Sequence, residues 1–467
     1  MSAPASNSST LPPRYVPADH EIGVLEKWEA ARAFHADPGP VLRGEKRPYA
    51  VVIPPPNVTD RLHLGHALNN TLQDILVRAH RMMGFEAIWL PGTDHAGIAT
   101  QTKVDRTLQA DGKPGIAHYK QKELAGEGGR DEFIALVQEW KEKYEAEILG
   151  QLKRMGCSCD WDRNRFTMDD ICARAVREAF FLFFRDGLIV RGKRLVNWDP
   201  ATQTALADDE VENKEVDGNF YYLRYPIVRG ADQPTTIEWG ELRARGYPAD
   251  LIPAIAKDTE PAYVTVATTR PETYLGDTAV ALNPRDTRAT ALAGLFVRLP
   301  FVGRIIPIIT DDYVVIPASM SGSTDDPKAA MATGFLKVTP AHDENDWAIG
   351  VRHNLPVINV FGPDASISDQ FGWTDVGEAA QFLGLSREDA RREVVKAFKQ
   401  TRVQGTEIPL MEKVSPHRHS VGHSYRSHVA IEPYLSDQWY LKVTDERLVG
   451  SAQRALGSSG SPSDGGT

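Results

Sequence analysis

The chain contains few cysteines, only Cys157, Cys159 and Cys172 among 467 residues. Three thiols in a chain of this length cannot build a disulfide framework, and such sparse use is typical of a reducing compartment, so we expect a cytoplasmic protein. Cys157 and Cys159 stand two residues apart, with no second ligand pair at the spacing of a zinc site. We therefore predict that they are packed thiols and that the chain has no structural metal.

Long hydrophobic runs and a basic excess are missing as well. No segment approaches the ~18 consecutive apolar residues that a membrane helix needs. Residues 1–13 lack the charged start and apolar block of a secretory signal, so we expect a disordered lead-in and no membrane partner. The 63 acidic residues outnumber the 53 Lys and Arg residues. The chain is thus not basic overall, although this does not exclude a local basic stripe that contacts phosphates.

The first half of the chain has the pattern of an α/β domain. Residues 19–34 have helical periodicity, with Asp19 as the expected N-cap. Apolar runs at 48–53 and 85–90 flank a helical pattern at 63–83. Strand, helix and strand in this order predict a βαβ unit with parallel strands. Further helical patterns lie at 130–155 and 169–186.

The character of the sequence changes near Lys193. Short β-rich runs lie at 220–225, 262–267, 313–316 and 336–338. Gly and Pro turns separate them, which predicts a β-rich second domain. A helical pattern at 376–400 closes this domain. From Gly457 onward the chain contains only Gly, Ser, Pro, Asp and Thr, a composition that cannot form a core.

A polar string follows the first expected strand and opens the next helix, at residues 54–66 with the sequence PPPNVTDRLHLGH. In an open α/β sheet, ligands bind at the carboxyl ends of the strands. His63 and His66 are three residues apart, so both rings can face one ligand beside a helix N-terminus that favours phosphate. Gly65 would let a base or ribose approach the backbone. The alternative, two histidines that contact solvent or satisfy core carbonyls, fits a lone histidine better than this whole string.

The motif His63-Leu64-Gly65-His66 resembles the HIGH signature of class I aminoacyl-tRNA synthetases. Residues 90–101, LPGTDHAGIATQ, resemble the block of the valyl-tRNA synthetase family, where isoleucyl and leucyl relatives carry a different block. Residues 156–161 and 195–200 are similar to further family motifs. The resemblance extends over about residues 15–443. Asp60 departs from it, because the family usually has Gly at this position.

By this resemblance the fold class is α/β, with an incomplete Rossmann-like catalytic domain that is interrupted by a β-rich editing domain. The expected parts are an N-terminal extension and helix at 1–47, the first half of the catalytic domain at 48–195, the inserted editing domain at 196–417, a return segment at 418–450 and a disordered tail at 451–467.

The resemblance implies a valine–tRNA ligase that uses ATP with Mg²⁺ to form valyl-adenylate and then charges tRNA(Val). His63 and His66 are the implied catalytic residues. The implied ATP-binding set is Pro54, Asn57, His63, Gly65 and His66, and the implied amino-acid-binding set is Pro55, Asn57 and Asp94. Asp94 would accept the ammonium group of valine, and its alternative role is a helix N-cap. Adenylation needs in-line placement and donors for developing charge rather than a covalent enzyme intermediate.

Residues 268–273 and 333–346 resemble the editing domain of the valyl, isoleucyl and leucyl synthetases. The implied editing set is Thr268, Arg270, Thr273, Lys337, His342, Asp343 and Asp346. Asp346 would hold the ammonium of misattached threonine, and Lys337 would contact the substrate or the tRNA terminus, with water as the nucleophile. Threonine is nearly isosteric with valine, and a valine pocket rejects it only about 100-fold, an established magnitude for valyl enzymes and not a result of the present structure.

Two alternatives to the editing interpretation stay open at the level of sequence. Lys337 and Asp346 could form a surface ion pair, which would contribute little to stability. His342, Asp343 and Asp346 could bind a metal, but no further ligand falls at a usual spacing.

Residues 424–427, SYRS, resemble the segment by which the family's chain returns to its catalytic domain. Beyond it no lysine loop of the KMSKS type is found, and the final lysine is Lys442. We therefore expect a truncated, monomeric chain with tRNA(Val), valine and ATP as partners. The alternative function is a ligase-inactive fragment that retains only aminoacyl-tRNA deacylation or the binding of tRNA or nucleotide.

Overall fold

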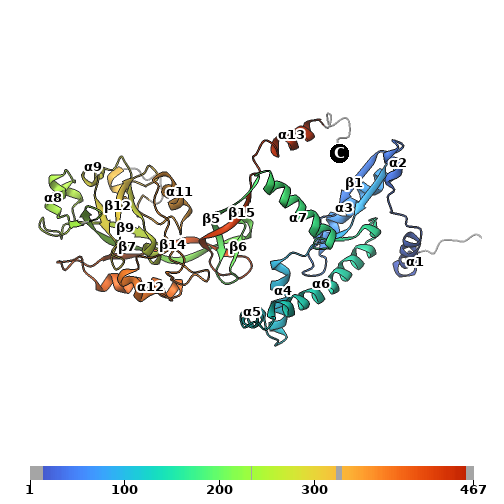
Figure 1. Cartoon of the computed structure of the whole chain (residues 1–467), viewed down its shortest axis with the longest axis horizontal. Helices are drawn as coiled ribbons and strands as arrows, with labels where there is room; N and C mark the ends of the chain where they lie inside the picture. Colours follow the sequence, from blue (N-terminus) through green and yellow to red (C-terminus); the bar gives the residue numbers. More distant parts are fainter. Residues whose placement is uncertain (1–13, 233, 322–328, 459–467) are drawn as a thin grey trace, which may run out of the picture. The chain divides into compact units, whose positions relative to one another are not determined.

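The computed structural model describes residues 14–232, 234–321 and 329–458, so the expected lead-in at 1–13 lies outside the described residues. The chain divides into two compact units, residues 1–190 with 441–467, and residues 191–440. Figure 1 shows the elements of each. None of the helices in the described part combines the length and the apolarity that a membrane crossing needs.

The first unit is built on a parallel pair of strands. β1 (Pro48–Val52) pairs with β2 (Glu86–Leu90), with Val51 opposite Trp89, and α3 (Leu64–Met82) connects them. This confirms the predicted parallel βαβ unit. Its core is a cluster of fully buried side chains, among them Ile53, Val77, Trp89, Ile148 and Leu152. β3 (Gly92–Thr93) continues beyond β2 and pairs in parallel with β4 (Arg165–Phe166).

Helices make up most of the rest of the first unit. They are α1 (Pro17–Ala30), α2 (Pro38–Leu42), α4 (Ile98–Ala110), α5 (Ile116–Leu124), α6 (Gly129–Arg154), η1 (Trp161–Arg163), α7 (Asp170–Arg185) and α13 (Val449–Ser458). The expected N-cap Asp19 is wrong, because α1 starts two residues earlier with Pro17 at a first-turn position and Val16 as N-cap. Proline presets the helical φ and has no N–H to satisfy there.

The second unit contains an eight-stranded sheet. Its strands are β7 (Val211–Arg229), β8 (Thr235–Thr236), β9 (Tyr263–Thr268), β10 (Ala279–Leu282), β11 (Phe296–Arg298), β12 (Ile305–Thr310), β13 (Phe335–Val338) and β14 (Met411–Ser424). The main path is β13-β10-β12-β11-β7-β14, and β8 and β9 also pair with β7. Only the β10–β12 pair is parallel among the described pairings of this sheet. Its core includes Tyr225, Trp239, Tyr274, Trp373 and Phe398.

A smaller sheet and several short helices complete the second unit. The small sheet has the order β15-β5-β6 and consists of β5 (Ile189–Asp199), β6 (Thr204–Leu206) and β15 (Glu432–Leu441). The helical segments are η2 (Asp208–Glu210), α8 (Trp239–Ala244), η3 (Ala249–Leu251), η4 (Pro271–Gly276), α9 (Ala289–Leu292), α10 (Ala318–Ser321), α11 (Glu344–Arg352), η5 (Gly377–Phe382) and α12 (Arg387–Gln400).

Three sequence expectations about local structure are corrected. Residues 313–316 are not a strand, because the Asp311 carboxylate accepts the Tyr313 N–H at 3.0 Å and closes a turn. Residues 376–400 form η5 and α12 rather than one helix. Gly384, with φ +78°, interrupts them, and Ser386 caps α12. Residues 451–458 belong to α13 (Val449–Ser458) instead of a disordered tail, and the rest of the expected tail, 459–467, lies outside the described residues.

Candidate functional site

The loops after β1 and β2 are joined at the backbone. The Val58 N–H donates to the Asp94 carbonyl at 3.0 Å, and the Asp94 N–H donates to the Pro56 carbonyl at 2.8 Å. The Trp140 indole on α6 donates to the Val58 carbonyl at 3.0 Å and anchors the first loop. Parallel pairing brings both carboxyl ends to one edge, so the two predicted ligand-binding loops lie side by side. The exposed members of the predicted set on this edge are Pro54, Pro55, Asn57, His63 and Gly65.

The two histidines of the first string open helix α3. Nδ1 of His63 accepts the Gly65 N–H at 3.0 Å, and the His63 N–H donates to Nδ1 of His66 at 3.2 Å. The two ring centroids are 3.9 Å apart. Burial lowers the pKa of His66, and the neighbouring His63 lowers it further. Because Nδ1 accepts in both rings, Nε2 carries the proton in each, which supplies two adjacent N–H donors.

Gly65 has a local role besides the ligand access that we expect. A Cβ atom at this position would lie 2.9 Å from Cε1 and 3.0 Å from Nδ1 of His63. Glycine therefore leaves room for the His63 ring to fold over its own helix N-terminus. The free N–H groups of that first turn and the positive end of the helix dipole favour an anion at this place.

Asp94 is a partly exposed carboxylate at the end of β3. Its Oδ1 accepts from the Thr167 hydroxyl at 2.9 Å and from the Ala96 N–H at 3.2 Å, and Nδ1 of His95 lies 3.3 Å away. The N-cap of α4 is Gly97, so the alternative role of Asp94 as a helix N-cap is wrong. These contacts all fall on Oδ1, while 33% of the side chain remains exposed. The carboxylate is therefore held in place and still accessible to an ammonium group.

The departure at Asp60 changes the contacts of the first loop. The Asp60 carboxylate accepts from Nζ of Lys103 on α4 at 2.7 Å and from the Arg61 N–H at 2.9 Å. The Lys103 hydrogen bond, followed by that of Arg61, holds the pKa of Asp60 below its ordinary value. Aspartate thus links this turn to α4 on the protein surface, which glycine at this position would not do.

In the second unit, the predicted residues Lys337 and Asp346 are buried around one threonine. Nζ of Lys337, on β13, donates to the Thr339 hydroxyl at 2.5 Å and lies 3.4 Å from Oδ1 of Asp277. Oδ2 of Asp346, in the first turn of α11, accepts the Thr339 N–H at 2.8 Å. The two residues are only 7% and 5% exposed. The alternative of a surface ion pair is therefore wrong.

The burial of Asp346 changes its acidity. Removal of the carboxylate from water raises the pKa of Asp346 to about 7, against the attraction of Lys337 and with a further upward contribution from Asp343. Protonated and ionised forms then coexist near neutral pH. A ligand that brings a positive charge, such as the ammonium group of an amino acid, would stabilise the ionised form and gain a buried charge-assisted contact.

Arg270 is tied to the elements around it. Its Nη1 donates to the His342 carbonyl at 3.2 Å, its Nη2 forms an ion pair with Glu432 of β15, and its Nε lies 3.6 Å from Glu272. Glu272 is fully buried and also binds Arg391 of α12 at 2.7 Å. The guanidinium therefore connects the two predicted polar blocks and retains about a quarter of its side chain exposed.

The other predicted editing residues have mainly structural contacts. Nε2 of His342 accepts the Val360 N–H at 3.1 Å, and burial lowers the pKa of this histidine well below its ordinary value, so it is a neutral, backbone-bound ring. The Asp343 carboxylate caps α11 by accepting the N–H groups of Asn345 and Asp346. The hydroxyls of Thr268 and Thr273 bond to the Arg270 N–H and carbonyl, each at 3.0 Å. They shape the turn that presents Arg270.

Sequence analysis missed four residues of this site, Asp277, Thr339, Glu272 and Glu432. Glu272 and Thr339 lie inside the two predicted polar blocks, where a charge or a hydroxyl alone did not distinguish them from the other polar residues of these blocks. Asp277 lies four residues beyond Thr273. Glu432 lies in the return segment 418–450, where its position after the motif at 424–427 was the available signal. Its contact with Arg270 spans 162 residues and only the fold reveals it.

The return motif meets an earlier motif inside the second unit. The Ser424 hydroxyl donates to Oδ2 of the buried Asp199 at 2.7 Å, and Trp198 donates to the Pro363 carbonyl at 2.7 Å. Hydrogen bonds from Ser424, Ser427 and Thr202, opposed by burial, hold the pKa of Asp199 below its ordinary value. The segments at 195–200 and 424–427, more than 200 residues apart in sequence, therefore form one structural junction.

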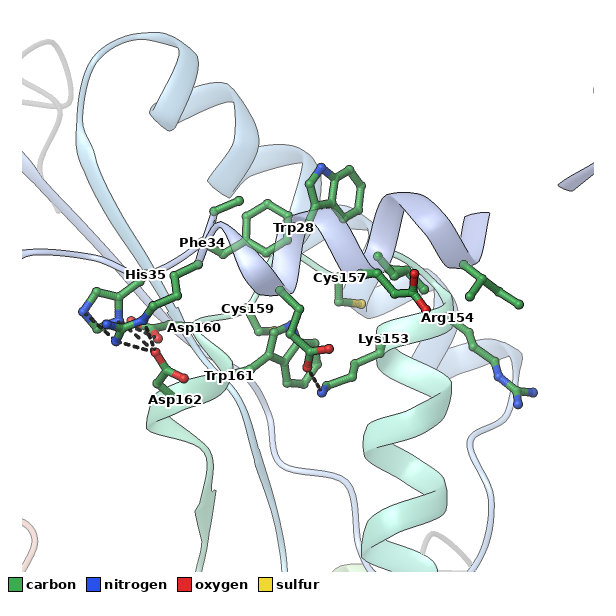
Figure 2. A pocket seen from close by; sticks show the side chains of 16 residues that line it. Trp28, Phe34, His35, Lys153, Arg154, Cys157, Cys159, Asp160, Trp161 and Asp162 are labelled. Atoms are coloured by element: carbon green, nitrogen blue, oxygen red, sulfur yellow. Dashed lines mark hydrogen bonds and ion pairs between the residues drawn. The ribbon is translucent and has the colours of Figure 1, made fainter. Parts of the chain in front are cut away.

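A cavity of about 490 Å³ lies in the first unit beneath α1. Figure 2 shows Trp28 and Phe34 on one side, with Cys157, Cys159 and Trp161 below. Burial raises the pKa of both thiols, which makes them poor nucleophiles. At its rim, His35, Asp160 and Asp162 bring ligand atoms within 4.8 Å of one another. Arg163 already binds Asp160, and Arg32 binds Asp162 at 2.5 Å.

Comparison with known proteins identifies a family and several similar proteins. Residues 23–457 match the model of the family described as tRNA synthetases class I (I, L, M and V). The chain is 44% identical to the valine–tRNA ligase of Chlamydia caviae, over 93% of this chain and 38% of that protein. It is 46% identical to the valine–tRNA ligase of Protochlamydia amoebophila, over 89% of this chain and 36% of that protein. The chain thus spans about two fifths of the length of the curated relatives it matches.

Among solved structures, the chain aligns with LeuRS of Agrobacterium radiobacter K84 agnB2 in a ternary complex with tRNA and LeuAMS. The TM-score is 0.36 and the identity 16%, over 90% of this chain and 49% of that one. A similarity this low carries no argument for the sites.

Proposed function

Because the chain belongs to the class I tRNA synthetases of the isoleucine, leucine, methionine and valine group, we propose that it acts as a valine–tRNA ligase. It would activate valine with ATP, transfer it to tRNA(Val) and remove mischarged threonine by hydrolysis. The observation that carries the proposal is the pair of Nε2–H donors on His63 and His66 at a helix N-terminus, beside a loop joined to Asp94. The identity to valine–tRNA ligases supports valine as the amino acid.

Each group of the first site has a part in this chemistry. ATP, entering with its Mg²⁺, would place phosphate oxygens against the two histidines and the α3 N-terminus. Asp94 would hold the ammonium of valine, so that the valine carboxylate can attack the α-phosphorus and release pyrophosphate. Neutral N–H donors aimed at developing phosphate charge lower the barrier without a proton transfer. Pro54, Pro55 and Asn57 are exposed on the same edge and would contact the substrates.

The test of this proposal is amino-acid-dependent exchange of pyrophosphate into ATP by the full-length protein. We expect exchange with valine, weaker exchange with threonine and little with isoleucine, because a pocket of valine size excludes the extra methylene. Charging of tRNA(Val) but not of tRNA(Ile) would complete the assignment. A preference for isoleucine or leucine over valine would contradict it.

The second unit supports the hydrolytic step. Asp346 would accept the ammonium of threonine esterified to tRNA(Val), and Lys337 would stabilise negative charge near the ester. Water adds to the ester carbonyl carbon, the bond to the ribose oxygen breaks, and the ribose oxygen takes up a proton, which releases free threonine and tRNA. Neutral, backbone-bound His342 does not serve as the base in this scheme.

A second candidate function is deacylation alone, favoured by the placement of every predicted editing residue inside the unit 191–440. To test it, the chain is incubated with threonyl-tRNA(Val) and valyl-tRNA(Val) at low salt, because phosphate contacts weaken with added salt. Preferential loss of threonine without valine-dependent exchange would favour this candidate. Equal hydrolysis of both esters by a folded sample would contradict any editing role.

A further inference from the structure

The hydroxyl of Thr339 is bonded on both sides in a fully buried position. It accepts from Nζ of Lys337 at 2.5 Å and donates to Oδ1 of Asp277 at 2.7 Å. The direction of both bonds is fixed, because an ammonium group can only donate and a carboxylate can only accept. The backbone N–H of the same residue donates to Oδ2 of Asp346 at 2.8 Å. One threonine thus contacts both Lys337 and Asp346 of the editing set.

The anchor of this arrangement is Asp277. Its second oxygen, Oδ2, accepts from the Tyr225 hydroxyl on β7 at 2.9 Å. Its other oxygen, Oδ1, lies 3.4 Å from Nζ of Lys337, which is longer than the ~2.7–2.9 Å of a good charge-assisted hydrogen bond. The Lys337 ammonium therefore depends on the Thr339 hydroxyl for its short contact. Without the Thr339 hydroxyl, the Lys337 ammonium would keep the 3.4 Å contact with Asp277 as its remaining polar contact in this group.

The methyl group of Thr339 orients that hydroxyl. The threonine Cγ2 packs against the backbone of Gly276, where an added Cβ would come within 3.2 Å of it and within 2.8 Å of the Ile358 carbonyl. A β-branched side chain has a restricted χ1. With the methyl on Gly276, the hydroxyl is directed to the next residue, Asp277. Serine would keep the hydroxyl but lose this steric restriction.

From these contacts we infer that Thr339 is a positioning residue of the editing site, whose hydroxyl holds the Lys337 ammonium and whose N–H holds the Asp346 carboxylate. The inference rests on the proposed deacylation function. Thr339 does not touch the reacting ester in this scheme. It acts by keeping two opposite charges at a set separation in a site shielded from water, where electrostatic contacts are strong.

The test compares Thr339→Val, Thr339→Ser and Thr278→Val in the full chain. Valine keeps the shape of threonine and removes only the hydroxyl contacts, so kcat for deacylation of threonyl-tRNA(Val) should fall on the order of 10- to 100-fold. KM should change much less, because most tRNA contacts lie elsewhere. Thr339→Ser should recover most of the rate. Thr278 is the matched control, equally buried, with its hydroxyl 3.5 Å from the Val338 carbonyl and outside this network.

The pH profile separates positioning from a loss of folded protein. The charged groups that act on Asp346 are Lys337, Asp343 and Asp277. Because the Lys337 charge favours the ionised carboxylate, release of its ammonium in Thr339→Val should move the acid limb of the profile to higher pH. A merely structural defect would lower the rate at every pH and leave that limb in place. If Thr339→Val does not fold, the same profile is measured for Thr339→Ala against Thr339→Ser at lower temperature.

The outcomes are distinguishable. A folded wild-type chain that hydrolyses no threonyl-tRNA(Val) contradicts the proposed function itself. A wild-type chain that hydrolyses it, together with a Thr339→Val chain whose kcat and acid limb match those of Thr278→Val, overturns the positioning role alone.

Discussion

The two candidate sites hold their polar and charged side chains in opposite ways. In the first unit, exposed side chains at strand ends and a helix N-terminus are held by neighbours a few residues away, as His63 is by Gly65. In the second, buried charges are held by partners from distant strands, as Asp277 is by Tyr225 and Thr339. An open site is suited to large substrates that enter and leave, whereas a buried one strengthens each charge contact and shifts its acidity.

The largest expected effect is on the first site. Asp94→Ala should lower valine-dependent ATP–pyrophosphate exchange by about 100- to 1,000-fold, because the valine ammonium would lose its charged partner. The matched control is Asp60→Ala, which removes a carboxylate from the same edge that binds only Lys103 and the Arg61 backbone. Exchange should then stay within about threefold. Near-normal exchange by Asp94→Ala would remove Asp94 from its role.

The second largest effect is expected from a substitution in the buried site. Asp346→Ala should reduce deacylation of threonyl-tRNA(Val) by about 100-fold, because the substrate ammonium loses an acceptor in a water-poor site. Valine-dependent exchange should be unchanged, since the two sites lie in different units. The control is Asp312→Ala, a carboxylate outside the set. A loss of exchange together with deacylation would show that the two sites do not work separately.

A smaller effect is expected for the histidine pair. His66→Ala removes one Nε2–H donor and the acceptor for the His63 N–H, so exchange should fall on the order of 10- to 50-fold, mainly in kcat. His66→Asn, which offers an amide N–H, should recover part of this loss. His80→Ala, at the other end of α3 where the ring stacks on Tyr49, is the control. Equal losses for His66→Ala and His80→Ala would indicate a folding defect instead of a lost donor.

The smallest effect near neutral pH is a pH dependence of deacylation at the second site. With a pKa of about 7, Asp346 is half protonated at that pH. Deacylation should be halved near pH 7 and fall about tenfold per unit below it, because the protonated carboxyl does not attract the ammonium. Asp346→Asn, slow at all pH values, should lack this acid limb. A wild-type profile flat from pH 6 to 8 would mean that the substrate meets an already ionised Asp346.

Asp346 also makes the stability of the fold depend on pH, with a sign opposite to that of an ordinary salt-bridged carboxylate. The folded pKa of Asp346 lies above its ordinary value of 3.8, so the folded state binds more protons between about pH 4 and pH 7. This contribution favours folding fully below that window and is lost as the pH rises through it. Asp346→Asn removes the titration, so its melting temperature should fall less than that of the wild type between pH 5 and pH 8.

How much the sequence revealed differs between the two units for a physical reason. The βαβ unit and the helix opening at His63 were predicted because their signals are local, namely two short apolar runs, the helical periodicity between them and the prolines that follow the first strand. Asp94 was placed correctly at a strand end. The prediction of a strand at residues 313–316 is wrong, because the Asp311 carboxylate accepts the Tyr313 N–H and closes a turn there.

By itself, the sequence determined the family, the parallel pair β1–β2, the place of His63 and His66 at the start of one helix, and most of the polar residues of the second candidate site. The tertiary structure alone decided that Lys337 and Asp346 are buried, that Glu432 reaches Arg270 across 162 residues, and that Thr339 joins the two charges. Local patterns reflect backbone preferences over a few residues. Burial and charge pairing depend on which strands become neighbours, and that requires the whole chain to fold.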